Sequence, residues 1–574
     1  MKATIGAIVD GGTSINYKTG DWREYRPVFL EKIAPCQEAC PVGNNIPAFL
    51  KEVKNKRLDL AWQILMQENP FPSICGRVCF HPCEDACNRK IFDESVSINA
   101  LERFVGDYGL HKGLTITKPK IQFEKPIAVV GSGPAGLSCA YHLRRLGYDV
   151  KIFERSSALG GMLRWGIPNY RLPEDILNRE IDRILSLGVQ VETGASINKD
   201  FFSAGLEEFA ALFLAIGAQK TVSLGIEGED LPGVFLGLQF LSNTRKKNRQ
   251  EFGEKVVIVG GGNTAIDVAR TVLRLGSQPT ILYRRTQDEM PAVEEEVRES
   301  LLEGVKIEFL TTPVSIKNAG ENKLQIECVR NRLGNPDADG RRLPVQLVDS
   351  NFMIEADNVI LAIGESVETE IFPDNFQVTE NGVYVDKLGA TSIPGVFAGG
   401  DVVSGYRTVS HAIGAGKKAA ASIDSFINKR DNNRLESAFL GNKGAISLGE
   451  YIQPLANNRR NDRVVKFEEL NHAYFQKISR VKIPKVDEFQ KRITSFAEVN
   501  LTVSSVQAIS EAERCFQCGT CSLCEVCYTF CPDSALSRVN LYERFEIDYD
   551  YCKGCGICAN ECPSCLIEMV REEK

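Results

Sequence analysis

Seventeen of the nineteen cysteines lie in two groups near the ends of the chain. Six fall between Cys36 and Cys87, and eleven fall between Cys515 and Cys565. In a large chain whose start carries no evident export signal, clustered thiols indicate metal ligands rather than disulfides. Cys139 and Cys328 stand alone between the groups, in helix- or strand-like contexts, where small core residues need no function.

The carboxy-terminal group contains the pattern C-x-x-C-x-x-C-x-x-x-C-P twice. It resembles the run of bacterial two-cluster ferredoxins, in which the fourth cysteine binds the other cluster. We therefore expect two [4Fe-4S] clusters, one on Cys521, Cys524, Cys527 and Cys562 and one on Cys552, Cys555, Cys558 and Cys531. Zinc knuckles are the alternative, but they give no reason for the third evenly spaced cysteine or the trailing Cys-Pro. Three cysteines are surplus: Cys515, Cys518 and Cys565.

The amino-terminal cysteines are spaced by four, which places successive thiols on one face of a helix. The sequence around the last four, CGRVCFHPCEDAC, resembles the helical iron–sulfur domain of the glutamate synthase small subunit and of dihydropyrimidine dehydrogenase. In that family two runs of cysteines share two clusters, one of which has a non-cysteine ligand.

Matching this family residue by residue implies one complete cluster, on Cys40, Cys79, Cys83 and a side-chain oxygen of Glu102. The other cluster would keep only Cys36 and Cys87, because no cysteine precedes Cys36. The resemblance therefore implies one amino-terminal cluster and three in all. A second amino-terminal cluster, a different choice among the six thiols, and a solvated Glu102 are the alternatives.

The segment KPIAVVGSGPAGLSCAYHLRRLGYDVKIFE predicts a strand, a glycine turn, a helix and a second strand. Gly131, Gly133 and Gly136 would let the backbone approach a pyrophosphate at the helix amino terminus. Glu154 ends the second strand, where a carboxylate accepts hydrogen bonds from a ribose diol.

Further motifs favour FAD at this first fingerprint. Gly161 and Met162 belong to a second glycine motif that lies against the cofactor in FAD enzymes. Later, Gly400 and Asp401 follow a strand, placed to bind the ribityl chain or phosphate, and precede a helix that can point at the flavin ring.

A second fingerprint, KVVIVGGGNTAIDVARTVLRLG, predicts a nicotinamide nucleotide site. Its candidate binding residues are Gly260, Gly262, Asn263, Thr264 and Ala265. The following strand ends in Arg284 and Arg285 rather than an acid, and guanidinium groups bind a 2′-phosphate. NADP(H) is therefore favoured over NAD(H), the alternative being a charged turn or stacking on adenine.

No catalytic acid or base is expected, because hydride transfer needs orientation rather than a protein nucleophile. His411 lies near the expected flavin, and we interpret it as a structural residue.

These motifs predict an α/β protein with tandem Rossmann-type FAD and NAD(P) domains, an all-helical amino-terminal iron–sulfur domain and an α+β ferredoxin domain. The expected boundaries are 25–115 for the helical domain, 120–248 plus 370–430 for FAD, 249–369 for NAD(P), 431–505 for a connector and 506–574 for the ferredoxin.

From about residue 30 to 430 the chain resembles the glutamate synthase small-subunit family. The added ferredoxin module resembles NAD(P)H:acceptor subunits associated with 2-oxoacid:ferredoxin oxidoreductases or dissimilatory sulfite reductase. The resemblance implies an NAD(P)H:acceptor oxidoreductase that exchanges electrons with a partner redox protein. A self-contained small-molecule reductase and a non-catalytic scaffold are the alternatives.

The remaining composition limits the partners and the location. A net charge of −7 without a Lys/Arg block argues against nucleic acid. No apolar run is long enough for a membrane span, and the start has too short an apolar stretch for a signal peptide. A cytoplasmic protein is expected, and the sequence leaves its oligomeric state open.

Overall fold

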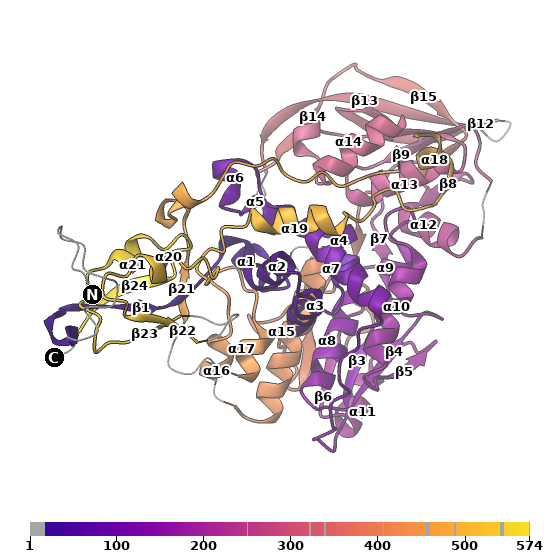
Figure 1. Ribbon diagram of the computed structural model, residues 1–574. Helices are drawn as coiled ribbons and strands as arrows, with labels where there is room; N and C mark the ends of the chain where they lie inside the picture. The colour runs from indigo at the N-terminus through magenta and orange to yellow at the C-terminus, as the bar shows by residue number, and fades with distance from the viewer. Residues whose placement is uncertain are drawn as a thin grey trace.

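The computed structural model describes residues 18–248, 251–320, 323–337, 340–403, 405, 407–430, 432–453, 460–486, 489–539 and 545–572. Figure 1 shows two α/β lobes on the right, one above the other, a group of helices at the centre and a small lobe projecting to the left. None of the helices in these ranges is long and apolar enough to cross a membrane.

The lower α/β lobe, here the first Rossmann lobe, is built on a five-stranded parallel sheet with the order β20-β6-β3-β4-β5 (Figure 1). The strands are β3 (Ile127–Val130), β4 (Val150–Glu154), β5 (Gln190–Thr193), β6 (Ala211–Leu214) and β20 (Val396–Ala398). Its helices are α8 (Pro134–Arg145), α9 (Met162–Trp165), α10 (Glu174–Leu185), α11 (Asp200–Glu208) and α15 (Val409–Ile427). The central strands β3 and β6 are buried along their whole length, as expected for apolar runs covered on both faces.

The upper lobe, the second Rossmann lobe, has a parallel sheet with the order β11-β10-β9-β16-β8. Its strands are β8 (Val234–Leu236), β9 (Lys255–Val259), β10 (Gln278–Leu282), β11 (Lys306–Glu308) and β16 (Asn358–Leu361). Its helices are α12 (Gly237–Arg245), α13 (Asn263–Arg274) and α14 (Glu294–Glu303), with η3 (Gln287–Glu289). β8 comes from the segment 120–248 of the sequence-based division and pairs here with β16.

An antiparallel sheet extends the second lobe. It consists of β12 (Thr311–Gly320), β13 (Lys323–Pro336), β14 (Arg342–Gln346) and β15 (Phe352–Ala356), with β13 at its centre. The pair β7 (Lys220–Thr221) and β17 (Glu365–Ser366) lies where the chain crosses between the lobes. A short hairpin near the first lobe comprises β18 (Val378–Thr379) and β19 (Gly382–Val383).

The central helices form the helical domain. They are α1 (Pro35–Ala39), α2 (Ile46–Lys54), α3 (Leu58–Glu68), α4 (Pro72–Val78), α5 (Pro82–Asp85), α6 (Arg89–Phe92) and α7 (Ile98–Lys112). Helix α19 (Ser505–Glu513), from far along the chain, packs against α2 and α7. The helical domain is thus assembled from both ends of the sequence.

The small lobe on the left of Figure 1, the C-terminal lobe, holds the two ferredoxin-like cysteine runs. Its elements are α20 (Val526–Thr529), β22 (Leu536–Arg538), β23 (Phe545–Ile547), α21 (Ile557–Asn560) and β24 (Ile567–Arg571). Strand β1 (Tyr25–Phe29) pairs antiparallel with β24, and β2 (Glu31–Ile33) pairs parallel with β21 (Arg460–Val464). The remaining short helices are η2 (Gly20–Trp22), α16 (Asn432–Glu436), α17 (Leu448–Ile452), η4 (Phe467–Glu469), η5 (His472–Tyr474) and α18 (Phe489–Thr494).

A buried ion pair joins the helical domain to the first Rossmann lobe. Lys417 of α15 is fully buried, and its Nζ lies 2.5 Å from Oε2 of Glu68 at the end of α3. The same ammonium donates to the Val42 carbonyl, while Glu68 also accepts from the hydroxyl of Ser447 at 2.7 Å and the amide of Leu448 at 2.9 Å. Both charges are compensated, so the pair fixes how α3, α15 and α17 meet.

We expect Lys417→Met to lower the midpoint of thermal unfolding strongly. Removing the ammonium leaves the Glu68 carboxylate buried without its cation, a change that costs about 3–5 kcal/mol. The matched control is Lys387→Met, because Lys387 forms an exposed ion pair with Glu436 at 2.9 Å, worth about 0–1 kcal/mol. Equal effects of the two substitutions would contradict this account.

Candidate functional site

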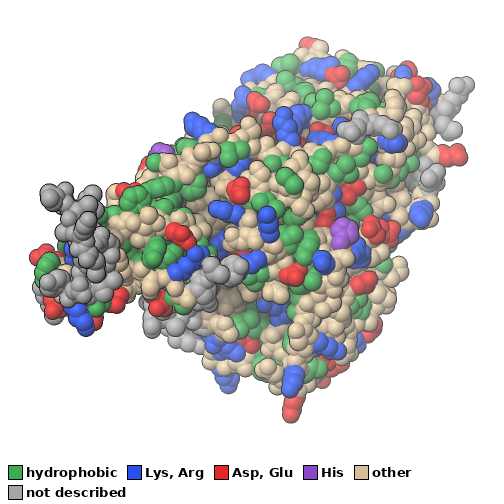
Figure 2. All heavy atoms as spheres, viewed as in Figure 1, with side chains coloured by type: hydrophobic (Ala, Val, Ile, Leu, Met, Phe, Trp, Pro, Cys, Tyr) green, Lys and Arg blue, Asp and Glu red, His purple; other side chains and the backbone are tan. Residues whose placement is uncertain are grey.

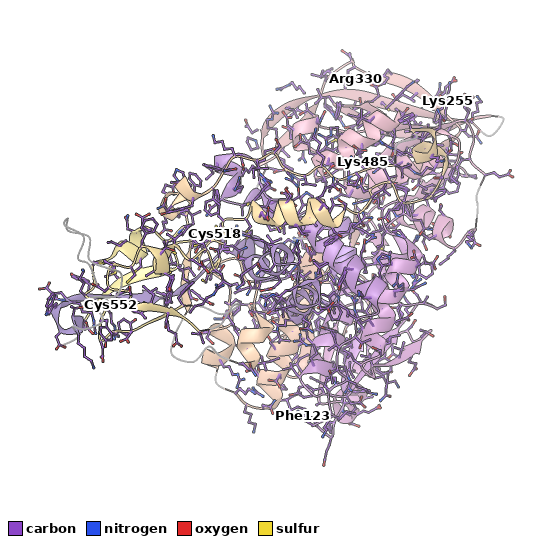
Figure 3. All side chains as sticks on the ribbon, viewed as in Figure 1. Phe123, Lys255, Arg330, Lys485, Cys518 and Cys552 are labelled. Carbon is purple, nitrogen blue, oxygen red and sulfur yellow. The ribbon has the colours of Figure 1, made fainter. Side chains whose placement is uncertain are left out.

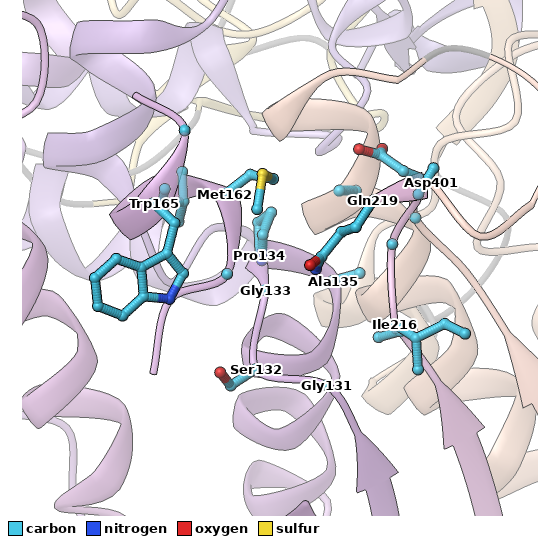
Figure 4. A pocket seen from close by; sticks show the side chains of 18 of the residues that line it. Gly131, Ser132, Gly133, Pro134, Ala135, Met162, Trp165, Ile216, Gln219 and Asp401 are labelled. Carbon is cyan, nitrogen blue, oxygen red and sulfur yellow. The ribbon is translucent and has the colours of Figure 1, made fainter. Parts of the chain in front are cut away.

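A central pocket of about 460 Å³ lies between the two Rossmann lobes (Figure 4). The turn after β3 forms one wall, with Gly131, Ser132 and Gly133 leading into α8. Met162 and Trp165 of α9 line a second side, and Ile216, Gln219 and Asp401 line a third. From the second lobe, Asn263, Thr264 and Asp267 reach the same pocket. Residues of both sequence fingerprints therefore share one cavity.

The turn after β3 has the shape that a bound pyrophosphate needs. Gly131 adopts φ +98°, and a Cβ at Gly136 would lie 1.9 Å from the Gly131 carbonyl oxygen, so this turn requires glycine at both places. At Gly133, by contrast, a Cβ would meet no atom within 4 Å. The open space above Gly133 and the amino terminus of α8 fit a dinucleotide phosphate. The indole N–H of Trp165 is buried and has no partner among the described residues, which leaves a donor for a bound group.

Glu154 ends β4 beside this turn, where the sequence predicts a ribose-binding acid. One oxygen, Oε2, accepts from the Ser132 amide at 2.9 Å and the Ser132 hydroxyl at 2.5 Å, and Oε1 accepts from the Ser156 amide at 2.7 Å. The carboxylate therefore shapes the glycine turn as well as lining the pocket.

Gly400 and Asp401 lie on the opposite wall, after β20. Burial raises the pKa of the Asp401 carboxyl, and the nearby Arg407 guanidinium partly opposes the shift. Arg407 also lines the pocket, a residue that no sequence motif singled out. Gly161 of the second glycine motif approaches the turn closely, since a Cβ there would lie 2.8 Å from the Gly133 Cα.

Helix α15 begins at this pocket and touches the helical domain. Thr408 caps the helix by accepting from the His411 amide at 3.2 Å and contacts the His411 ring, which supports the structural interpretation of that histidine. A Cβ at Gly414 would lie 2.1 Å from the carbonyl oxygen of Pro41, the residue after Cys40. The glycine therefore lets α15 approach the cysteine-bearing loop at backbone distance.

The loop after α4 separates the central pocket from a cysteine-lined cavity. Val78 and Phe80 line the central pocket, while Cys79 between them lines the cavity on the other side. This first thiol cavity also contains Cys40, Cys75, Cys83 and Glu102. Three of the expected ligands and Glu102 thus lie together, and Cys75 joins them although the family match gave it no role.

Glu102 is a buried side chain of α7 rather than a solvated charge. The amides of Asn44 and Asn69 both donate to its Oε1 at 2.8 Å and so orient the carboxylate. Burial raises the pKa of Glu102 to about 7, although these amide bonds oppose the shift. A carboxylate held in the same cavity as four thiols is well placed to be an oxygen ligand of a cluster.

The second fingerprint has the same local geometry as the first. A Cβ at Gly260 would lie 2.1 Å from the Ala362 carbonyl oxygen, whereas Gly262 faces open space at the start of α13. Ala265 is buried in the core behind the turn. After β10, Arg284 is exposed, while Arg285 is buried and its guanidinium lies 2.8 Å from the Asp337 carboxylate. The two arginines therefore have different environments.

The C-terminal lobe brings its thiols together in two groups. Burial, then interaction with Cys521, Cys562 and Cys524, raises the pKa of Cys527 to about 12. Burial, then Cys552, Cys555 and Cys531, does the same for Cys558. Cys527 and Cys558 each interact with cysteines of their own run and with the fourth cysteine of the other run, and Cys558 also acts on Cys527; the two ligand sets stay a prediction from the sequence.

Among the described residues, no three of His, Cys, Asp and Glu lie close enough to hold a single metal ion. Thiols that bind one zinc surround it at about 2.3 Å, whereas the ligands of a four-iron cubane bind four different irons and stand farther apart. The preference for cubanes over zinc therefore rests on the C-x-x-C-x-x-C-x-x-x-C-P pattern of the sequence.

Three family models match parts of this chain. Residues 125–416 match the family described as pyridine nucleotide-disulphide oxidoreductase. Residues 31–114 match the 4Fe-4S cluster domain II of dihydropyrimidine dehydrogenase, and residues 545–564 match a 4Fe-4S binding domain.

Three curated proteins illustrate the similarity. The chain is 36% identical to the NADPH-Fe(3+) oxidoreductase subunit beta of Geobacter sulfurreducens, over 85% of this chain and 76% of that protein. It is 38% identical to the NADP(+)-dependent formate dehydrogenase subunit beta of Moorella thermoacetica, over 69% and 60% of the two chains. It is 33% identical to the glutamate synthase [NADPH] small chain of Escherichia coli, over 68% and 88%.

We expect Glu102→Ala to lower the iron content by about four atoms per FAD, because the first thiol cavity loses its oxygen ligand. The matched control is Glu102→Gln, which keeps a side-chain oxygen at the same position. Iron and acid-labile sulfide analysis of anaerobically purified protein makes the measurement. Full iron in the alanine variant would show that Glu102 is not a ligand.

We expect Arg284→Ala to raise the KM for NADPH tenfold or more and to leave the KM for NADH nearly unchanged. A charge-assisted contact to phosphate is worth roughly 1.5–3 kcal/mol. Adding Arg285→Ala should increase the loss, partly because it also breaks the ion pair with Asp337. The surface variant Arg298→Ala is the control, and equal weakening of both nucleotides by Arg284→Ala would rule out a phosphate contact.

Proposed function

This chain belongs to the pyridine nucleotide-disulphide oxidoreductase family, and we propose that it passes electrons from NADPH, through FAD and [4Fe-4S] clusters, to a partner redox protein. The reverse direction uses the same sites. The proposed complement is one FAD, one amino-terminal cluster and two carboxy-terminal clusters, with NADP(H) as the nucleotide and NAD(H) as the weaker alternative.

The observation that carries this proposal is the position of Cys79. It lines the first thiol cavity, and both of its neighbours in the chain, Val78 and Phe80, line the central pocket. Ser410, in the first turn of α15, lines the thiol cavity too, while Val409 before it lines the pocket. Only one layer of residues separates the two sites.

When bound, FAD accepts an electron pair as hydride from the nicotinamide and iron–sulfur clusters carry single electrons. The chain's own residues position these groups. The glycine turns at Gly133 and Gly262 leave room for two pyrophosphates. Asn263, Thr264 and Asp267 of the second lobe line the same pocket as the first fingerprint, so a nucleotide bound there would lie near the flavin.

The C-terminal lobe has the surface expected of an electron exit. Cys524 and Cys555, one from each proposed cluster, are exposed. Tyr528 and Phe530, which follow Cys524 closely in the chain, are 51% and 52% exposed, and Figure 2 shows hydrophobic side chains on this side of the molecule. A partner that docks over Cys524 and Cys555 would approach both proposed clusters, and electron transfer requires such proximity.

The partner is proposed to be a second subunit of an oxidoreductase complex. The Geobacter and Moorella relatives are both named as beta subunits, which supports this reading. A 2-oxoacid:ferredoxin oxidoreductase, a sulfite reductase and a free ferredoxin are the acceptor classes proposed from the sequence.

We expect Cys555→Ser to abolish electron delivery to ferredoxin or to the native partner while NADPH-driven reduction of an artificial dye remains. The substitution removes one thiolate from a carboxy-terminal cluster and leaves the central pocket untouched. Substitution is preferable to deleting residues from 506 onward, because a deletion also removes α19 from the helical domain.

The control for this experiment is Cys328→Ser, which changes a buried thiol in the second Rossmann lobe that the proposed path does not use. Unchanged delivery by Cys555→Ser would place the exit at the amino-terminal cluster. Turnover of a small substrate without any second protein would favour a self-contained reductase instead.

A further inference from the structure

Four thiols without a role in the proposed path lie around one cavity. Cys36 and Cys87 come from the helical domain, and Cys515 and Cys518 come from the segment after α19. Most of the other residues that line this second thiol cavity are apolar, among them Ile46, Leu50 and Ile98, while Asn88 and Arg89 are polar. Figure 3 places Cys518 where the helical domain meets the C-terminal lobe, apart from Cys552 inside that lobe.

The four thiols line the same cavity and act on one another. After burial, interaction with Cys87, Cys515 and Cys518 raises the pKa of the Cys36 thiol, and interaction with Cys515 and Cys87 raises that of Cys518. Cys36 and Cys518 are only 7% and 8% exposed. None of the four is joined in a disulfide.

The segment that carries Cys515 and Cys518 is held firmly against the helical domain. Arg514 is fully buried, and its guanidinium lies 2.6 Å from Glu511 and 3.1 Å from Asp93. Glu511 accepts from the Ser97 amide at 2.8 Å, and the Arg514 carbonyl accepts from Arg89 at 2.7 Å. This network fixes the two cysteines opposite Cys36 and Cys87.

Further contacts reach the cysteine pair itself. The ring of Phe516, between the two cysteines, packs against Phe92 and Phe475 with centroids 5.7 Å and 4.5 Å apart. The side-chain amide of Asn88 lies 3.6 Å from the Cys518 sulfur, and the backbone N–H of Gln517 lies 3.4 Å from the Cys515 sulfur. N–H donors of this kind stabilise cluster-bound thiolates.

We propose that Cys36, Cys87, Cys515 and Cys518 bind a fourth [4Fe-4S] cluster, built jointly by the two ends of the chain. Four thiols around a protected, largely apolar cavity meet the ligand requirement of a cubane. Zinc is the alternative occupant of four thiols, and metal analysis distinguishes the two.

The position of this cluster links the other cluster sites. Ile46 and Ile98 line both thiol cavities, so the two cavities are adjacent. On the other side, Gly519 follows Cys518 and exchanges backbone hydrogen bonds with Lys32 and with Ser564 of the C-terminal lobe, at 3.1 Å and 2.7 Å. This fourth cluster does not depend on the proposed function. It would lie between the cluster of the first thiol cavity and the clusters of the C-terminal lobe.

The test is metal analysis of the full chain, purified anaerobically and normalised to FAD. We expect about sixteen irons and sixteen sulfides in the wild type and about twelve in Cys515→Ser/Cys518→Ser. Zinc is measured on the same samples. Twelve irons in the wild type, or one zinc with twelve irons, would overturn the proposal.

Matched variants separate cluster loss from misfolding. Cys328→Ser should keep all the iron, and Cys36→Ser, altered at the other end of the chain, should lose the same four irons as the double variant. FAD content and NADPH-driven dye reduction report whether the Rossmann lobes remain folded. If the double variant retains FAD and all its iron, Cys515 and Cys518 are not ligands. Sixteen irons with no NADPH activity would leave this proposal standing and reject the proposed function.

Discussion

The approach of α15 to the cysteine loop of the helical domain is the contact on which the rest of the architecture depends. Gly414 admits the Pro41 carbonyl at a distance that a methyl group would block. The same helix starts at the central pocket, so its position places the pocket and the first thiol cavity on two sides of one residue layer. Electron transfer weakens steeply with separation, and a bulkier residue at position 414 would widen this gap.

Buried charges maintain that contact and the others like it. Lys417 with Glu68 joins α15 to α3, and Arg514 with Glu511 joins the late segment to the helical domain. Glu180 of α10 accepts from the amides of Ser73 and Ile74 at 3.0 Å and so caps the start of α4. Such pairs contribute modest net stability, but mispairing them is costly, so they specify how the domains dock.

The sequence predicts the individual motifs of this protein better than the contacts between its domains. The glycine turns, the acid at Glu154 and the two C-terminal thiol groups follow from local spacing, because turns and cubane ligands depend on short-range geometry. Arg407 was not predicted, because no motif marks it. Only the fold shows that it lines the central pocket near Asp401. Arg284 is exposed, whereas Arg285 is buried and paired with Asp337, a difference that a strand-end pattern does not reveal.

The second thiol cavity shows the same limit more sharply. Asn88 and Cys518 are in contact although 430 residues separate them in the chain. The spacing within either cysteine group therefore does not reveal that the two groups share a cavity. Cys515 and Cys518 look surplus beside a ferredoxin pattern that is already complete. Their place becomes apparent only when α19 is seen packed on α2 and α7.

Strands β1 and β2 have a consequence for how the protein is made. They leave the ribosome long before their partners β24 and β21, which lie at residues 567–571 and 460–464. At about 5–20 residues per second, β1 waits roughly half a minute to two minutes for β24. Throughout that interval its backbone edge is open to other chains, which makes it a site for misassembly. Completion of the amino-terminal region is thus a late event in biogenesis, and a chaperone that shields the nascent edge has a defined period in which to act.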